Sequence, residues 1–113
     1  MGIGIEKMLG KIVRVEFGQV SDYPFLFGIQ YEFLTNGWSV CGSDVVNTNI
    51  EAHGKGPDGQ ALMQCRLGEM LYRLIFTMNE ARVSSVEKLV GIPVEVTYEN
   101  NQFKSFRILK EVI

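Results

Sequence analysis

The sequence is poor in the residues that most metal and catalytic sites need. Its 113 residues include one histidine, His53, and two cysteines, Cys41 and Cys65, which are far apart. A structural zinc site needs four Cys or His ligands at close spacings, so we expect no metal and no cofactor. Both cysteines are expected to be free, partly buried thiols, as is usual in a reducing compartment.

Excess basic charge and long apolar runs are also missing. The 11 Lys and Arg residues are outnumbered by 13 Asp and Glu residues. Broad nucleic-acid binding is therefore not expected, because it needs clustered basic side chains. No apolar run approaches the ~18 residues of a membrane span, and the N-terminus lacks a signal-peptide pattern. We expect no membrane association, a cytoplasmic location and, at this length, a single domain over residues 1–113.

Alternating apolar residues predict strands in the first third of the chain. Residues 11–17 and 25–34 alternate in the two-residue period of a half-buried strand. Asn36-Gly37 then predicts a type I′ hairpin turn, because both positions need positive φ. This turn would pair Thr35 with Trp38 and would place Trp38 on the aromatic face that begins at Phe25.

The middle of the chain changes from irregular to helical. Residues 42–59 are rich in Gly, Asn, Asp and Ser and predict a long irregular connection, which is usually functional or disordered. Residues 60–82 predict one long helix, with Asp58 as its cap or as a favourable charge at its start. Ser84 and Glu87 predict a capping box for a short second helix over 86–90. The expected buried stripe of the long helix is Leu67, Met70, Leu71, Leu74, Ile75, Met78 and Ala81.

The C-terminal quarter predicts a β-hairpin. A two-residue Asn100-Asn101 loop would pair apolar with polar residues. An odd-numbered loop near Asn101 would instead pair Val94 with Ile108 and Glu95 with Arg107, which matches apolar with apolar and acid with base and predicts a bulged or longer loop. The predicted order of elements is β-β-β-α-α-β-β. This order indicates an α+β fold in which the long helix packs across one face of an antiparallel sheet of about five strands.

Two local features, a glycine-rich segment and the single histidine, are candidates for chemistry. Residues 54–59 match G-x-G-x-x-G, but the strand and acidic residue of a dinucleotide site are missing, so a flexible turn is the default interpretation. His53 has Ser43, Asp44 and Glu51 nearby in sequence, but no spacing known from a catalytic triad connects them. We therefore expect no catalytic residue, and a small hydrolase that uses His53 is the weakest hypothesis.

The ending of the chain resembles that of a family of small phage and prophage proteins. The similarity is carried by residues 89–100, LVGIPVEVTYEN, and by residues 104–112, KSFRILKEV, together with Glu16-Phe17-Gly18 and Gly37-Trp38. The resemblance implies a phage-encoded accessory protein in the cytoplasm of an infected or lysogenic bacterium. Such proteins are often counter-defence factors, and some are α+β oligomers that sequester nucleotide signals.

The leading hypothesis is a non-enzymatic homo-oligomer that sequesters a small anionic ligand, such as a cyclic or ADP-ribose-type nucleotide. Trp38 would stack on the ligand, asparagine side chains would hydrogen-bond to it, and guanidinium and ammonium groups would bind its charge. The candidate ligand-binding residues are Trp38, Asn47, Asn49, Lys55, Arg66 and Arg73.

The alternative is an inhibitor of a host defence effector or nuclease that binds through the 42–59 segment or a sheet edge. A flat apolar patch on the free protein would favour this alternative, and a deep pocket between protomers would favour sequestration.

Overall fold

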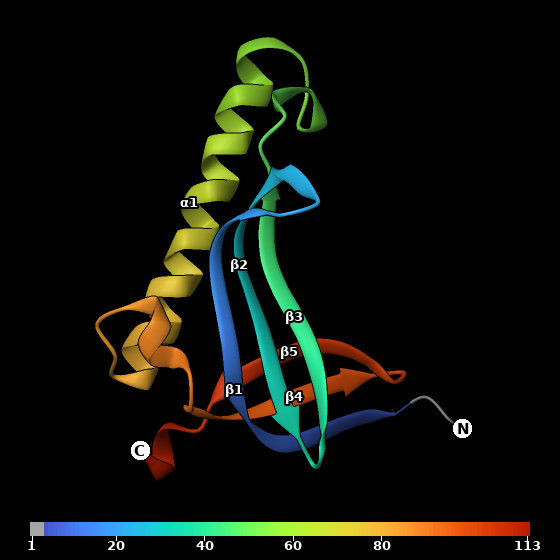
Figure 1. Ribbon diagram of the computed structural model, residues 1–113. Coiled ribbons are helices and arrows are strands. Elements are labelled where there is room, and N and C mark those ends of the chain that lie inside the picture. Colours follow the sequence, from blue (N-terminus) through green and yellow to red (C-terminus); the bar gives the residue numbers. More distant parts are fainter. Residues whose placement is uncertain (1–3) are drawn as a thin grey trace.

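The protein has an α+β fold in which one long helix packs on a five-stranded antiparallel sheet (Figure 1). A computed structural model describes residues 4–113. The strand order is β3-β2-β1-β4-β5, which confirms the predicted fold class. The bounds are β1 Ile5–Val20, β2 Tyr23–Thr35, β3 Trp38–Asn47, α1 Gly56–Ala81, β4 Pro93–Glu99 and β5 Gln102–Ile108, with short 3-10 turns η1 Ile50–Ala52, η2 Val86–Leu89 and η3 Lys110–Val112.

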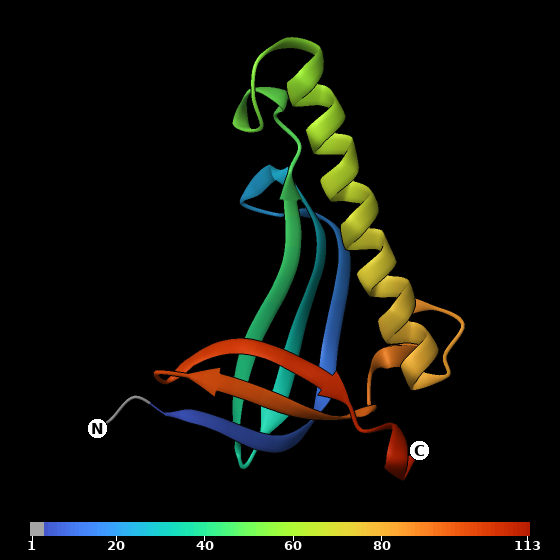
Figure 2. The ribbon, with the colours of Figure 1, turned by 180° about the vertical axis from the view of Figure 1, so that it is seen from behind.

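Strand β1 joins two differently oriented halves of the sheet. Residues 5–11 pair with β4, and residues 10–20 pair with β2. Gly10 pairs on both sides, and a Cβ there would lie 2.4 Å from the carbonyl oxygen of Leu34. Only glycine permits this close approach of the strands. As a result, β4 and β5 run across the ends of β1–β3, as both views show (Figures 1 and 2).

The first hairpin turn forms as the sequence predicts. Asn36 and Gly37 have φ values of 48° and 91°, as a type I′ turn requires. Thr35 pairs with Trp38, which confirms the predicted register. This register places Trp38 on the same face as Val40, as predicted, but at the tip of the hairpin Trp38 is 66% exposed.

The second hairpin has the predicted pairs but a different turn. Its turn is the two-residue Asn100-Asn101, with φ values of 55° and 65°, and not an odd-numbered loop. A bulge corrects the register, since Tyr98 pairs with Phe103 and Lys104 is left without a cross-strand partner. The pairs beyond the bulge include Val94 with Ile108, Glu95 with Arg107 and Val96 with Phe106.

The segment predicted to be irregular, 42–59, is mostly regular. Residues 43–47 continue β3, because residues 26–30 of β2 extend far enough to satisfy their backbone groups. A 3-10 turn follows, and α1 begins at Gly56, four residues earlier than predicted. Pro57 lies in the first turn, where its missing N–H leaves no helical bond unmade. Asp58 contributes charge there, but no side chain caps the helix.

The second predicted helix is smaller than expected. Residues 86–89 form the single 3-10 turn η2, and Ser85 precedes it without a side-chain capping bond. The predicted capping box from Ser84 to Glu87 is therefore absent. Ser84 instead accepts a hydrogen bond from Lys88 at 3.0 Å.

The core lies between the concave face of the sheet and one narrow stripe of α1. Helix α1 contacts β3 and β5 and, to a smaller extent, β2. Leu71 and Ile75 were expected in this core but lie on the exposed side of the helix, because α1 touches the curled sheet only along its inner edge. The core cluster is Ile12, Ile29, Tyr31, Phe33, Leu74, Ala81, Leu89, Val94, Val96 and Ile108.

Candidate functional site

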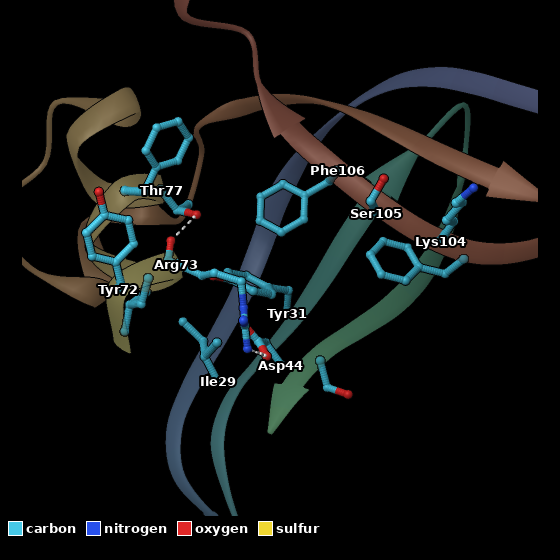
Figure 3. A pocket seen from close by; sticks show the side chains of 13 residues that line it. Ile29, Tyr31, Asp44, Tyr72, Arg73, Thr77, Lys104, Ser105 and Phe106 are labelled. Carbon is cyan, nitrogen blue, oxygen red and sulfur yellow. Dashed lines mark hydrogen bonds and ion pairs between the residues drawn. The ribbon is translucent and has the colours of Figure 1, made fainter. Parts of the chain in front are cut away.

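A pocket of about 420 Å³ opens between α1 and strands β3 and β5 (Figure 3). Its volume lies in the usual range for small-molecule sites. Figure 3 shows Tyr72 on the helix side and Phe106 on the β5 side, with Arg73 reaching across to Asp44. The aromatic residues that line the pocket are Tyr31, Tyr72, Phe76, Phe103 and Phe106.

The sheet side of this aromatic pocket is a fixed wall. Phe103 stacks on Phe33 with ring centroids 5.6 Å apart and an interplanar angle of 15°. Phe106 meets Tyr31 edge to face, with centroids 4.8 Å apart. Ring pairs in these two arrangements stabilise each other beyond their buried area. The wall is therefore held in place without a ligand.

The helix side of the pocket is an open wall. Tyr72 is 70% exposed and Phe76 is 57% exposed, although both line the pocket. They lie one turn apart on α1, so their side chains share one face of the helix. A planar group that entered the pocket would cover apolar surface on both walls.

Arg73 and Asp44 form the polar floor. The Arg73 Nε and Nη2 atoms donate to the two Asp44 carboxylate oxygens at 2.7 and 2.9 Å. The hydrogen bond to Asp44 raises the pKa of Arg73. A guanidinium has five N–H donors, so three remain for other acceptors. Both side chains are solvent-accessible, so the pair orients Arg73 more than it stabilises the fold.

Tyr31 lies beneath this floor as a neutral phenol. Burial raises the pKa of Tyr31, and the nearby Asp44 carboxylate raises it further. Both effects disfavour the phenolate. The O–H of Tyr31 therefore stays a hydrogen-bond donor over the physiological pH range.

A second hollow, also about 420 Å³, adjoins the aromatic pocket at Arg73. Here Arg66 Nη1 donates to His53 Nδ1 at 2.7 Å, and His53 Nε2 donates to the Asn47 carbonyl oxygen at 2.5 Å. This pattern assigns the neutral imidazole with its proton on Nε2. Both ring nitrogens are thus engaged, and within residues 4–113 no hydrogen bond connects His53 to Ser43 or to a carboxylate.

The structure brings together only half of the candidate residues. Asn47, Arg66 and Arg73 line the second hollow, and Arg73 also lines the aromatic pocket. Asn49 and Lys55 are exposed and line neither space.

Trp38 starts β3, whereas Asn47 ends it, so the two are about 30 Å apart at roughly 3.3 Å per residue. Trp38 lines a separate hollow of about 560 Å³ near Tyr98. The six candidates therefore do not form one site.

Several residues of the aromatic pocket were not among the candidates, including Tyr72, Phe76, Phe103 and Lys104. Tyr72 and Phe76 could have been recognised from the sequence as candidate binding residues, because they are large aromatic residues outside the predicted buried stripe. No sequence pattern pointed to Phe103, because its position depends on the bulge at Lys104 and on the curl of the sheet.

The two cysteines are free, as expected, but both are exposed and not partly buried. Within residues 4–113, no three His, Cys, Asp or Glu side chains gather in a way that could hold a metal ion. None of the helices described is long and apolar enough to cross a membrane. No protein-family model matches the chain, and no curated protein or solved structure matches it.

Proposed function

We propose that the protein is a non-enzymatic binding protein for a small ligand with a planar ring and an acidic group. The ring would enter the aromatic pocket, and the acidic group would lie near Arg73, towards the second hollow. The observation that carries this proposal is that Arg73 lines both spaces. One ligand could occupy both spaces and contact the same guanidinium.

The aromatic walls supply most of the expected affinity. A base or similar ring between Tyr72 and Phe106 would stack on one side chain and meet the other. Stacking of a base on an aromatic side chain contributes about 1–3 kcal/mol. The neutral O–H of Tyr31 would donate one orienting hydrogen bond to the ligand.

The charges select a ligand of low negative charge. Arg66, Arg73 and Lys104 line the two hollows together with Asp44 and Glu69. Lys104 is also paired with Glu99 at 2.7 Å, so the surplus of positive charge is small and suits one acidic group better than a polyanion. Arg73 already binds Asp44, so an acidic group would use its remaining N–H donors.

Sequestration fits this chemistry better than turnover. His53 uses both ring nitrogens in hydrogen bonds to Arg66 and to the Asn47 carbonyl, and Asp44 is bound by Arg73, so neither is poised as a general base. The resemblance of the C-terminal hairpin to phage proteins supports a nucleotide-type immune signal of a bacterial host as the ligand. On this proposal the protein is a phage counter-defence factor that removes the signal by binding it.

The first test is native mass spectrometry of the protein with cyclic di- and trinucleotides and ADP-ribose isomers. The proposal expects one of them to be retained intact at a fixed ratio to protein. Chemical conversion of the bound nucleotide would contradict the non-enzymatic part of the proposal. No retention across the panel would contradict the nucleotide class.

The second test places the retained ligand in the pocket by calorimetry. Tyr72→Ala should weaken binding by about 1–3 kcal/mol, the usual contribution of one stack. Arg73→Gln should weaken it by about 1.5–3 kcal/mol, as expected for a hydrogen bond to a charged group. Trp38→Ala is the matched control, because Trp38 is equally exposed but lies at the other end of β3. Loss of binding in Trp38→Ala alone would move the site to the hollow beside Tyr98.

A second candidate function is inhibition of a host protein through a sheet edge. The supporting observation is that β3, ten residues long, forms one edge of the sheet, with exposed Trp38 at its start. An edge strand can pair with a strand of another protein. A captured host protein that protects the β3 amides from hydrogen exchange would favour this function. Unchanged exchange in β3 would count against it.

A further inference from the structure

The face of α1 that points away from the sheet is uncharged and largely apolar. Between residues 61 and 79 the only charged residues are Arg66, Glu69 and Arg73, and all three line the hollow beside β3. The opposite side of the helix exposes Tyr72, Ile75 and other apolar side chains. A helix face in water usually carries charge, so this face is unusual for a monomer.

The exposed apolar area is close to what a dimer needs. Tyr72 and Phe76 are 70% and 57% exposed, which is roughly 250 Å² per copy if an aromatic side chain presents about 200 Å². Leu71 and Ile75, also more than 40% exposed, add to the same patch. The aromatic residues of two copies would together bury roughly 500 Å², and the aliphatic and small residues of the face add to this area towards the ~1,000 Å² lower limit of a specific interface.

The face is divided into a small half and a large half. Its N-terminal half exposes the small residues Ala61, Cys65 and Gly68, and nothing lies within 4 Å of a Cβ built at Gly68. Its C-terminal half exposes the larger Tyr72 and Ile75. An antiparallel copy of the helix would place large side chains over small ones in both halves.

We propose that this face of α1 binds the same face of a second copy, with the two helices antiparallel about a two-fold axis near residue 70. Such an isologous contact is the commonest way in which soluble proteins form dimers. With the axis at residue 70, two residues face each other across the interface when their numbers add up to 140. Gly68 faces Tyr72, and Cys65 faces Ile75.

Charge complementarity at the ends of the helix supports a second copy as the occupant. Asp58 lies in the first turn of α1, and Arg82 follows its last residue. The same two-fold axis brings Asp58 of one copy towards Arg82 of the other, at both ends of the interface. A parallel arrangement would instead place like charges together, which is unfavourable.

The dimer and the proposed ligand can be tested separately. Ile75 lines neither hollow, so a change there tests the dimer without altering the pocket. Tyr72 and Phe76 belong to both surfaces, so the second copy would cover the outer side of one pocket wall.

The first experiment is sedimentation equilibrium of the full chain, with circular dichroism to verify folding. The wild-type protein should be a dimer at micromolar concentration. Ile75→Glu should raise the dimer dissociation constant at least about tenfold, because it places a charge in an apolar interface. Leu9→Glu is the matched control, since Leu9 is an exposed aliphatic residue on β1, and it should leave the dimer unchanged. A monomeric wild type, or a dimer unaffected by Ile75→Glu, would overturn the proposal.

The second experiment tests the antiparallel register by disulfide formation. In a Cys41→Ser background, Ile75→Cys should cross-link with the native Cys65 of the second copy under mild oxidation. The added change Cys65→Ser should abolish this covalent dimer. A dimer that never cross-links would overturn the antiparallel arrangement. Stoichiometric binding of a different protein to this face, with the wild type monomeric, would replace the second copy as its occupant.

Discussion

Replacing Gly42 by alanine should disturb both the fold and the aromatic pocket. A Cβ on Gly42 would lie 2.6 Å from two ring carbons of Phe103. The ring would have to move by roughly 1 Å to reach an ordinary carbon–carbon separation of 3.5–4.0 Å. Phe103 cannot turn freely, because it is stacked on Phe33. Overpacking of this kind typically costs about 1–3 kcal/mol, and we expect that loss in the free energy of unfolding.

A double-mutant cycle isolates this contact. Phe103→Leu alone should destabilise the protein by about 1 kcal/mol or more, because one aromatic stack is lost. In the double variant Gly42→Ala/Phe103→Leu the smaller side chain leaves room for the new methyl group. The double variant should therefore be about 1–2 kcal/mol more stable than the sum of the single changes implies.

Urea denaturation followed by circular dichroism measures all four proteins at one concentration. A Gly42→Ala variant as stable as the wild type would refute the packing argument. Additive effects in the cycle would refute the specific role of Phe103, even if Gly42→Ala were destabilising. In that case the alanine would act through the β3 backbone and not through the pocket wall.

Three further changes test other parts of the structure. The pKa of Tyr31 is raised in the folded state, so the phenol loses its proton more easily in the unfolded chain. The free energy of unfolding should therefore fall as pH rises above about 10. Tyr31→Phe should make urea denaturation curves less sensitive to alkaline pH. Thr35→Val should lower the free energy of unfolding by about 0.5–1.5 kcal/mol, because it removes the 3.3 Å hydrogen bond between Thr35 and Tyr98. Adding Tyr98→Phe to Thr35→Val should destabilise the protein little further, because the same hydrogen bond is already lost. Asn101→Gly should raise the melting temperature slightly, because φ is 65° at this position, whereas Asn101→Val should lower it.

Local sequence patterns predicted the sheet well where the turn chemistry was unambiguous. Asn36-Gly37 specified both the turn and the register of β2 with β3. The pairing of Glu95 with Arg107 followed from matching charges and apolar residues across the strands. The mismatch of faces in a simple two-residue loop indicated a bulged or longer loop, and a bulge is present at Lys104. Its position within β5 was not predicted, because Tyr98 pairs with Phe103 and not with Lys104.

The curvature of the sheet and the relative placement of distant residues could not be predicted from local sequence patterns. The apolar spacing of α1 placed Leu71 and Ile75 in the buried stripe, but the sheet curls at Gly10 and leaves that side of the helix uncovered. Arg66 and Arg73 were proposed as binding residues from their spacing, and they do line neighbouring hollows. The sequence patterns placed Trp38 in the same site as these arginines. Trp38 lies elsewhere, because β3 is ten residues long and Trp38 stands at the opposite end of the strand from Asn47.

The most direct test of the binding site is a nitrogen–proton correlation spectrum of the labelled protein, titrated with the nucleotide retained in native mass spectrometry. The account predicts that the largest shifts fall on amides around Arg73 of α1 and Phe103–Phe106 of β5, with Trp38 unaffected. Shifts centred on Trp38, or spread evenly over the surface, would contradict a ligand site between α1 and β5.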